Sequence, residues 1–179
     1  MFIKKMIECF FVWHMPSDSE DCLKKADVLI GQSFGNRPND DPGKSNEELA
    51  DIAKEVHKKY CVPLILQWEI ADCINDVSKA GVVRKHQEKG KYLDTYEVIA
   101  QSKDICEKNG WRRSIILAHP QHCWRCVMTA KKLGLDTLVV ATKKVPYDHL
   151  SDQIWTRNAW IFIPRELISR LFYLLTGKI

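Results

Sequence analysis

The sequence predicts an α/β protein with a doubly wound, mostly parallel sheet. Four short apolar runs indicate buried strands, and segments with helical spacing of apolar residues separate them. Short strands that alternate with helices imply parallel strands joined by right-handed crossovers. The chain has 179 residues, of which 45% are hydrophobic and 28% charged, so it can bury one core as a single domain, 1–179.

The first strand is expected in ADVLIG (26–31), an apolar run that ends in glycine. A turn-rich loop, QSFGNRPNDDPGKS (32–45), follows it. The segment SNEELADIAKEVHKKY indicates a helix capped by Ser45 or Asn46, and VPLILQW (62–68) indicates the second strand.

In the second half, Asp94 or Thr95 is expected to cap a helix over 94–110, which Gly110 ends. SIILA (114–118) is expected as the third strand and DTLVVAT as the fourth, and the helix HPQHCWRCVMTAKKLG lies between them.

PRELISRLFYLL (164–175) predicts an amphipathic closing helix with Pro164 at its first position. Residues 1–20 and 69–92 carry no decisive pattern, although IADCINDVSKAG suits a short helix.

Charge and composition exclude several classes of protein. The net charge of +4 is mild, so dedicated nucleic-acid binding is not expected. No apolar run approaches the roughly 20 residues of a membrane span, and the N-terminal run lacks a signal-peptide cleavage site. Seven cysteines, an odd number, do not indicate a disulfide framework. We therefore expect a cytoplasmic protein with reduced thiols, while its oligomeric state stays open.

In parallel sheets, ligands bind outside the carboxyl ends of the strands. This rule brings together GQSFGNR, QWE and AHPQH, which follow the first three strands, and the helix start DTYE. The glycines of Gly31–Gly35 suit either a tight turn or a backbone cradle for an anion. His122 and Arg125 share one face of a helix's first turn, where they would suit an anionic ligand.

His119, His122, Cys123 and Cys126 offer a different kind of site, a non-catalytic zinc or thiol sensor. A lowered pKa of Cys123 near a helix N-terminus would favour redox chemistry. However, the four side chains span about 10 Å of helical rise, which is too far to hold one ion together. No metal site is therefore assigned, and the sensor stays an alternative.

Four stretches in order resemble a known bacterial family. KADVLIGQSFG, DTYE, SIILAHPQHCWRCVMTAKKLGL and PRELISRLFYLLTG cover residues 24–177. Together they are similar to the YdcF/SanA/ElyC-like proteins, also called domain of unknown function 218. The resemblance implies a Rossmann-like three-layer sandwich with an extra C-terminal helix and a crevice for a small ligand. That ligand would be nucleotide-like or otherwise anionic, with S-adenosylmethionine as one candidate.

The resemblance also implies roles for particular residues. Arg125 would hold the anion, and His122 and Glu97 would be catalytic if the protein is a hydrolase or transferase, which stays open. The loop Gln67-Trp68-Glu69 departs from the family's Ser-Gly-Gly, and Val98 stands where the family often has Asn. Arg165 and Glu166 match the closing helix. The expected ligand-binding residues are Gly31, Gln32, Ser33, Thr95, Glu97, His119, His122 and Arg125.

Overall fold

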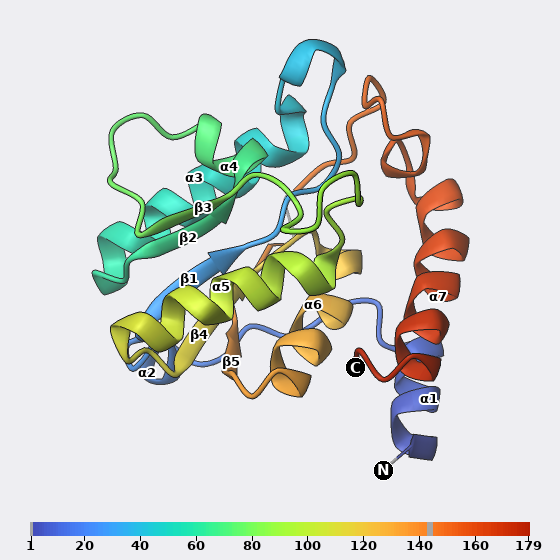
Figure 1. The fold of residues 1–179 in the computed structure, drawn as a ribbon, viewed down its shortest axis with the longest axis horizontal. Coiled ribbons are helices and arrows are strands. Elements are labelled where there is room, and N and C mark those ends of the chain that lie inside the picture. The colour runs from blue at the N-terminus through green and yellow to red at the C-terminus, as the bar shows by residue number, and fades with distance from the viewer. Residues whose placement is uncertain (1, 143–144) are drawn as a thin grey trace.

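The computed structural model describes residues 2–142 and 145–179, which form one α/β fold (Figure 1). Five parallel strands make one sheet in the order β3-β2-β1-β4-β5. The predicted Rossmann-like class with a parallel sheet between two helical layers is thus confirmed. The strands are β1 (Val28–Gly31), β2 (Leu64–Gln67), β3 (Gly81–Val83), β4 (Arg113–Leu117) and β5 (Asp136–Val139).

Helices cover both faces of the sheet (Figure 1). Alternate residues of each central strand point to opposite faces, so Leu29 packs toward α3 and α4 while Val28 and Ile30 pack toward α5 and α6. All three side chains are fully buried. The helices of these layers are α3 (Gly43–Tyr60), α4 (Trp68–Asp72), α5 (Thr95–Asn109) and α6 (Pro120–Lys132).

Two further helices lie side by side at one edge of the molecule (Figure 1). They are α1 (Phe2–Phe11) and α7 (Ala159–Leu175), and the short elements α2 (Glu20–Leu23), η1 (Pro38–Asp40) and η2 (Ile154–Thr156) complete the fold. A third apolar cluster, which includes Cys9, Trp124 and Tyr173, joins α1 and α7 to α6. The first and last segments of the chain are therefore packed against the same side of the sandwich.

Two helix starts differ from the prediction. Helix α3 begins at Gly43, because Asp41 accepts a hydrogen bond from the Gly43 N–H and Asp148 accepts one from the Lys44 N–H. Ser45 and Asn46, the expected caps, are instead buried in the first turn. The first N–H groups of α3 are thus capped by carboxylates that lie outside the helix.

Helix α7 begins at Ala159, five residues before the predicted start, because the Asn158 side chain caps the Ile161 N–H. Pro164 is therefore inside the helix rather than at its first position. By contrast, the caps of α5 agree with the prediction: Asp94 precedes the helix, and Gly110 ends it with a φ of 72°.

No strand was predicted for β3, a three-residue strand at the edge of the sheet. Only Val83 in this strand is buried, so it has no apolar run of the kind that marks the other strands. The short helix expected over IADCINDVSKAG (70–81) is present only in its first residues, because α4 begins at Trp68 directly after β2 and ends at Asp72, and Gly81 begins β3.

Candidate functional site

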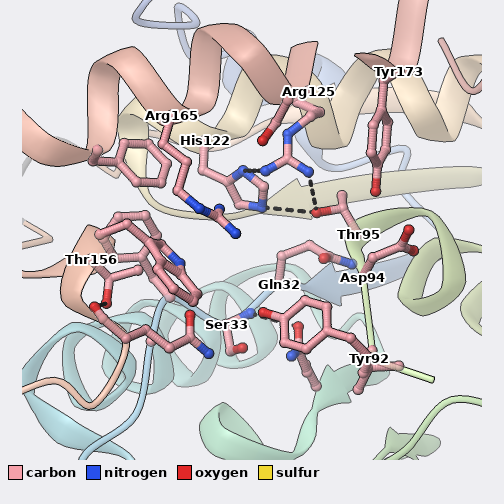
Figure 2. Close-up of a pocket in the computed structure, with 18 residues that line it drawn as sticks. Gln32, Ser33, Tyr92, Asp94, Thr95, His122, Arg125, Thr156, Arg165 and Tyr173 are labelled. Carbon is pink, nitrogen blue, oxygen red and sulfur yellow. Dashed lines mark hydrogen bonds between the residues drawn. The ribbon is translucent and has the colours of Figure 1, made fainter. Parts of the chain in front are cut away.

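A polar cavity of about 210 Å³ lies beside the carboxyl ends of β1 and β2 (Figure 2). Its walls are the loop after β1, the segment before α5, the first turns of α5 and α6, the region around η2, and α7. This is the place where parallel α/β sheets hold ligands. Of the predicted ligand-binding residues, five line the cavity: Gln32, Ser33, Thr95, His122 and Arg125.

Gly31, Glu97 and His119 are not among the lining residues. Gly31 is needed for packing, because a Cβ there would lie 2.6 Å from the Leu66 side chain of the neighbouring strand. The requirement for glycine at this position is thus explained by the contact between β1 and β2, without a ligand.

Glu97 points toward the segment before α5 instead of into the cavity. Its Oε1 accepts hydrogen bonds from the Gln87 N–H at 3.0 Å and from Gln101 Nε2 at 2.8 Å, and its Oε2 lies 3.6 Å from His86. The predicted assistance of Glu97 to His122 is not supported by this arrangement. Glu97 and Gln101 together anchor residues 85–87 to α5.

His119 caps α6 and stacks on an aromatic ring. Its Nδ1 accepts a hydrogen bond from the Gln121 N–H at 3.4 Å, and its ring lies 3.8 Å from that of Phe34 at an interplanar angle of 11°. Burial lowers the pKa of His119 to about 3, so the ring is neutral. These contacts hold His119 against Phe34, a lining residue, while His119 itself stays outside the cavity lining.

A buried ion network lies above the cavity. Glu166 Oε2 accepts a hydrogen bond from Arg125 Nη2 at 2.7 Å, and Glu166 Oε1 accepts one from Arg170 Nε at 3.2 Å. Although burial opposes ionisation, the positive charge of Arg125 holds the pKa of Glu166 well below its usual value. Arg125, the predicted anion ligand, therefore already binds a carboxylate of the protein.

The hydrogen bonds of His122 define which nitrogen carries its proton. Its Nδ1 lies 3.2 Å from Arg125 Nη2, which can only donate, so Nδ1 accepts. The Nε2 then carries the hydrogen and donates to Thr95 Oγ1 at 3.3 Å. Burial and the Arg125 charge lower the pKa of His122, which keeps the ring neutral. Both ring nitrogens are thus engaged, which argues against a free acid or base here.

Thr95 is left with a free hydroxyl hydrogen by the same network. Its Oγ1 accepts from His122 and also from Arg125 Nη1 at 2.9 Å, as the dashed lines in Figure 2 show. Two donors occupy the oxygen, so the Thr95 O–H is available to donate to an acceptor in the cavity. The predicted residues Thr95, His122 and Arg125 thus act as one unit.

Arg165 is a second cationic residue of the cavity lining, and it was not among the ligand-binding residues predicted from the sequence. Its guanidinium group lies in the cavity below His122 and stacks on the Trp155 indole, with Cζ 4.0 Å from the ring centroid (Figure 2). Burial lowers its pKa, but an arginine stays charged at neutral pH. In the described part of the chain, Arg165 forms no ion pair with a carboxylate.

Among the described residues that line the cavity, Asp94 is the single one with a carboxylate side chain. Asp94 pairs with Lys178 at 2.8 Å, which together with the Glu97 N–H holds the pKa of Asp94 below its usual value against the effect of burial. Gln32 is 1% exposed, and its Nε2 donor has no partner among the described residues. The cavity thus combines positive charge with the available Thr95 hydroxyl, while the unpaired Gln32 amide lies buried in its wall.

The loop after β1 is fixed by a side chain of α3. Asn46 Oδ1 accepts a hydrogen bond from the Phe34 N–H at 2.8 Å, and Asn46 Nδ2 donates to the Gly35 carbonyl at 2.6 Å. Gly35 has a φ of 71°, and a Cβ there would overlap Thr156 Oγ1. The glycine is therefore required by the turn and by the close approach of the η2 region.

Several lining residues were missed from the sequence, including the aromatic side chains Tyr92 and Trp155. They lie in segments without a clear helix or strand pattern. The recognisable signals were the tryptophan of QIWT and the Arg165-Glu166 pair, but nothing local links them to the carboxyl ends of the strands. Stretches that the strand-end rule brought together also contain lining residues that were not selected as ligand-binding, namely Phe34, Gly35, Gln67 and Asp94. The further missed residues are Leu93, Gln153, Thr156, Phe162, Ser169 and Tyr173.

The cysteines of α6 pack into the core. Cys123 and Cys126 are buried, and burial raises the pKa of Cys123 to about 12 and that of Cys126 well above its usual value. The lowered pKa of Cys123 that the redox alternative would need is not found, because loss of hydration outweighs the helix N-terminus. Among residues 2–142 and 145–179, no group of three His, Cys, Asp or Glu side chains is placed to hold a metal ion.

Comparison with protein-family models, curated proteins and solved structures found no match to this chain. The resemblance to the YdcF-like family therefore stays a prediction. Within the residues that the structure describes, no helix combines the length and apolar character needed to cross a bilayer.

Proposed function

We propose that the protein binds a small anionic metabolite in the cavity beside β1 and β2. The observation that carries this proposal is Arg165, a cation in the cavity wall without a carboxylate partner in the described chain. A phosphate or carboxylate would supply the missing negative charge through bidentate hydrogen bonds. The Trp155 ring would hold the guanidinium plane in position.

The surrounding charges and donors favour the same kind of ligand. Arg125 and Arg170 share a single buried carboxylate, Glu166, so the ion network keeps one excess positive charge next to the cavity. The Thr95 hydroxyl would donate to a further oxygen atom of the ligand. A ligand with an anionic group and an adjacent oxygen acceptor would therefore satisfy the cavity.

Size and charge favour a phosphate- or carboxylate-bearing metabolite over the larger candidates. The cavity volume of about 210 Å³ is below the roughly 300–1,000 Å³ typical of pockets for drug-sized ligands. S-adenosylmethionine also carries a positive sulfonium group, which Arg125 and Arg165 would repel. A nucleotide, which the resemblance to the YdcF-like family implies as a ligand, is the larger anionic alternative.

We propose that the protein binds this metabolite, and we assign no chemical reaction to the site. His122 would be the natural acid or base of a hydrolase or transferase, but Arg125 and Thr95 occupy its two nitrogens. Its role in this proposal is to orient the Thr95 hydroxyl toward the ligand.

A thermal-shift screen tests this proposal. The panel contains inorganic phosphate, pyrophosphate, glycerol 3-phosphate, citrate, adenosine monophosphate and S-adenosylmethionine, with sodium chloride as the ionic-strength control. A ligand at about 100 times its Kd adds roughly 2.7 kcal/mol of stability. For a chain of this size, that corresponds to a rise of about 5–10 °C in Tm.

The Arg165→Gln variant should lose this shift, because it removes the charge and the fork of donors. The matched control is Arg112→Gln, which removes an exposed arginine outside the cavity and should keep the shift. An equal response of Arg165→Gln and the wild-type protein to every anion would contradict the proposal.

A further inference from the structure

A buried carboxyl group, that of Glu69, lies next to the cavity lining. Glu69 belongs to the first turn of α4, directly after β2, and is 5% exposed. Its Oε2 is buried and has no hydrogen-bond partner in the part of the chain that the structure describes. Burial of a polar atom without a partner is costly, so the position of this carboxyl group is not explained by packing alone.

One side chain connects Glu69 to the cavity. Gln67 Nε2 donates to Glu69 Oε1 at 3.3 Å, and Gln67 Oε1 accepts a hydrogen bond from the Ser33 N–H at 3.2 Å. Gln67 and Ser33 both line the cavity, and Figure 2 shows Ser33 in its wall. The Glu69 carboxyl group therefore lies directly behind two lining residues.

Glu69 and Arg165 act electrostatically on the same lining residue, Tyr92. Burial raises the pKa of Tyr92, and among the nearby charges Arg165 lowers this pKa while Glu69 raises it. Both charges are thus within electrostatic range of the cavity. An ionised Glu69 would oppose the attraction of Arg165 for an anion, whereas a neutral Glu69 would not.

The charges on the outer side of α4 do not compensate Glu69. Asp72 of α4 pairs with Arg84, from the segment after β3, through two hydrogen bonds of 3.0 and 2.6 Å. Asp40 of η1 lies beside this pair and adds a further negative charge. Arg84 is therefore engaged by another carboxylate than that of Glu69.

The elements packed against α4 also supply no cation to Glu69. Strands β2 and β3 contain no titratable side chain. Helix α3 faces the far end of α4, where burial raises the pKa of Cys73 and the charges of Glu47 and Asp51 contribute in the same direction. Lys54 of α3 pairs with Asp51 at 2.7 Å. Glu69 is thus buried among groups that disfavour its negative charge.

These surroundings place the ionisation of Glu69 near neutral pH. Burial raises the pKa of Glu69 from 4.5 to about 7, and hydrogen bonding by its own N–H and the neighbouring Ser33 and Gln67 side chains offset only part of this effect. The charge behind the cavity wall therefore changes in a pH range in which the rest of the cavity keeps its arginine charges.

We propose that the cavity binds its anion together with a proton, which Glu69 holds. This inference rests on the proposed function, because it concerns the same cavity and the same anion. The proton comes from the solvent and neutralises Glu69, so that Arg165 attracts the anion unopposed. By linkage, the bound anion favours the protonated form of Glu69 to the same extent. Anion affinity should therefore fall as pH rises through neutrality and level off once Glu69 is ionised.

Isothermal titration with sodium sulfate at two pH values and constant ionic strength tests this inference. Sulfate is the probe because, unlike phosphate, it keeps the same charge at about pH 5.5 and about pH 8.5, so a change in affinity reports the protein. We expect the wild-type chain to bind sulfate about tenfold more weakly at the higher pH, which is the order of effect of a nearby like charge in a protein.

The variant Glu69→Gln should bind sulfate with the same affinity at both pH values, because its side chain stays neutral while the shape of the carboxyl group is kept. The matched control is Glu47→Gln, the same chemical change at an exposed position of α3, which should keep the wild-type pH dependence. Circular dichroism at both pH values verifies that each variant is folded.

Proton uptake gives a second readout, which a purely structural role of Glu69 would not change. Sulfate titrations at about pH 7 in two buffers with different ionisation enthalpies measure the number of protons taken up on binding. The wild-type chain and Glu47→Gln should take up a fraction of a proton for each sulfate bound, and Glu69→Gln should take up none.

Two results would overturn this inference and leave the proposed function standing. One is equal sulfate affinity of the wild-type chain at both pH values. The other is a pH dependence that persists in Glu69→Gln, which would assign the titration to another group such as His122. Absence of sulfate binding by the folded wild-type chain at either pH would instead contradict the proposed function, and this inference with it.

Discussion

Glu166 is enclosed by Arg125 and Arg170, and none of the three side chains is more than 9% exposed. Charges taken out of water are costly unless their partners satisfy them, and here the carboxylate is shared by two guanidinium groups. Arg170 also donates to the carbonyl oxygens of Val12 and Gln121, which joins the segment after α1 to α6. This network therefore fixes Arg125 rigidly and leaves ligand contact to Arg165.

Replacement of Glu166 tests the structural role of this network. Glu166→Gln removes the negative charge and leaves two buried guanidinium groups without compensation, which we expect to cost about 3–5 kcal/mol of unfolding free energy. Urea denaturation measures this loss. Glu107→Gln, which removes an exposed pair with Lys103, should change stability by less than about 1 kcal/mol. A similar small effect at Glu166 would show that the network is not a stabilising element.

A second buried carboxylate gives the fold a pH dependence. Glu69 is 5% exposed, and burial raises its pKa from 4.5 to about 7. Its Oε2 has no partner among the described residues, while its Oε1 accepts from Gln67 Nε2 at 3.3 Å. Because the folded-state pKa is the higher one, the unfolded chain loses its proton first as pH rises. Stability is therefore expected to fall between about pH 4.5 and pH 7 and then to level off.

The variant Glu69→Gln should remove this pH dependence. At about pH 8 it should be more stable than the wild type by up to roughly 3 kcal/mol, because no buried charge forms. At about pH 4 the two proteins should be nearly equal, since both carry a neutral side chain at this position. Urea denaturation at both pH values gives the comparison. A wild-type chain whose advantage over the variant grows with pH would contradict the assignment.

At the scale of elements, the loop after β1 depends on helix α3. Asn46→Ala removes the acceptor of the Phe34 N–H and the donor to the Gly35 carbonyl, both in a buried setting. We expect a loss of about 1–3 kcal/mol and a weaker ligand response, because Ser33 and Gly35 line the cavity.

The matched control for this loop is Asn109→Ala at the end of α5, where an exposed side chain donates to the Ile105 carbonyl. Surface changes of this kind are usually within about 0.5 kcal/mol. Denaturant unfolding together with the thermal-shift response separates the two variants. An Asn46→Ala protein that keeps full stability and full ligand response would show that the loop holds its own shape.

Elements with strong local signals were predictable from the sequence. The four apolar strands, the Asp94 cap, the Gly110 stop and the Pro120 start all depend on residues within a few positions. The start of α7 was missed because the cap Asn158 lies before an apolar run that includes Pro164. The edge strand β3 was missed because pairing with β2, and not its own apolar content, defines it.

The site was only partly predictable for a related reason. The rule for parallel sheets correctly brought Thr95, His122 and Arg125 to one cavity. Thr95 and Glu97 are two residues apart in a helix, so they point in different directions, and only the threonine reaches the cavity. Arg165 and Trp155 reach it through the path of α7 and η2 across the strand ends, which no local pattern encodes.

At the scale of the whole molecule, helix α7 connects the cavity to α1. Arg165 of α7 lines the cavity, and α7 lies beside α1 at one edge of the molecule (Figure 1). Arg170 donates to the carbonyls of Cys9 and Val12, so the position of α1 is coupled to the ion network above the cavity. A change in the packing of α1 thus has a physical route to the site through α7.

The central claim is that Arg165 holds an anion in the cavity, and isothermal titration with inorganic phosphate tests it most directly. We predict one phosphate per wild-type chain, with an affinity that falls as salt is raised, and binding about tenfold or more weaker in Arg165→Gln. Arg112→Gln should bind like the wild type. Equal phosphate affinity in Arg165→Gln and the wild type, or no binding by the folded wild-type chain, would contradict the account.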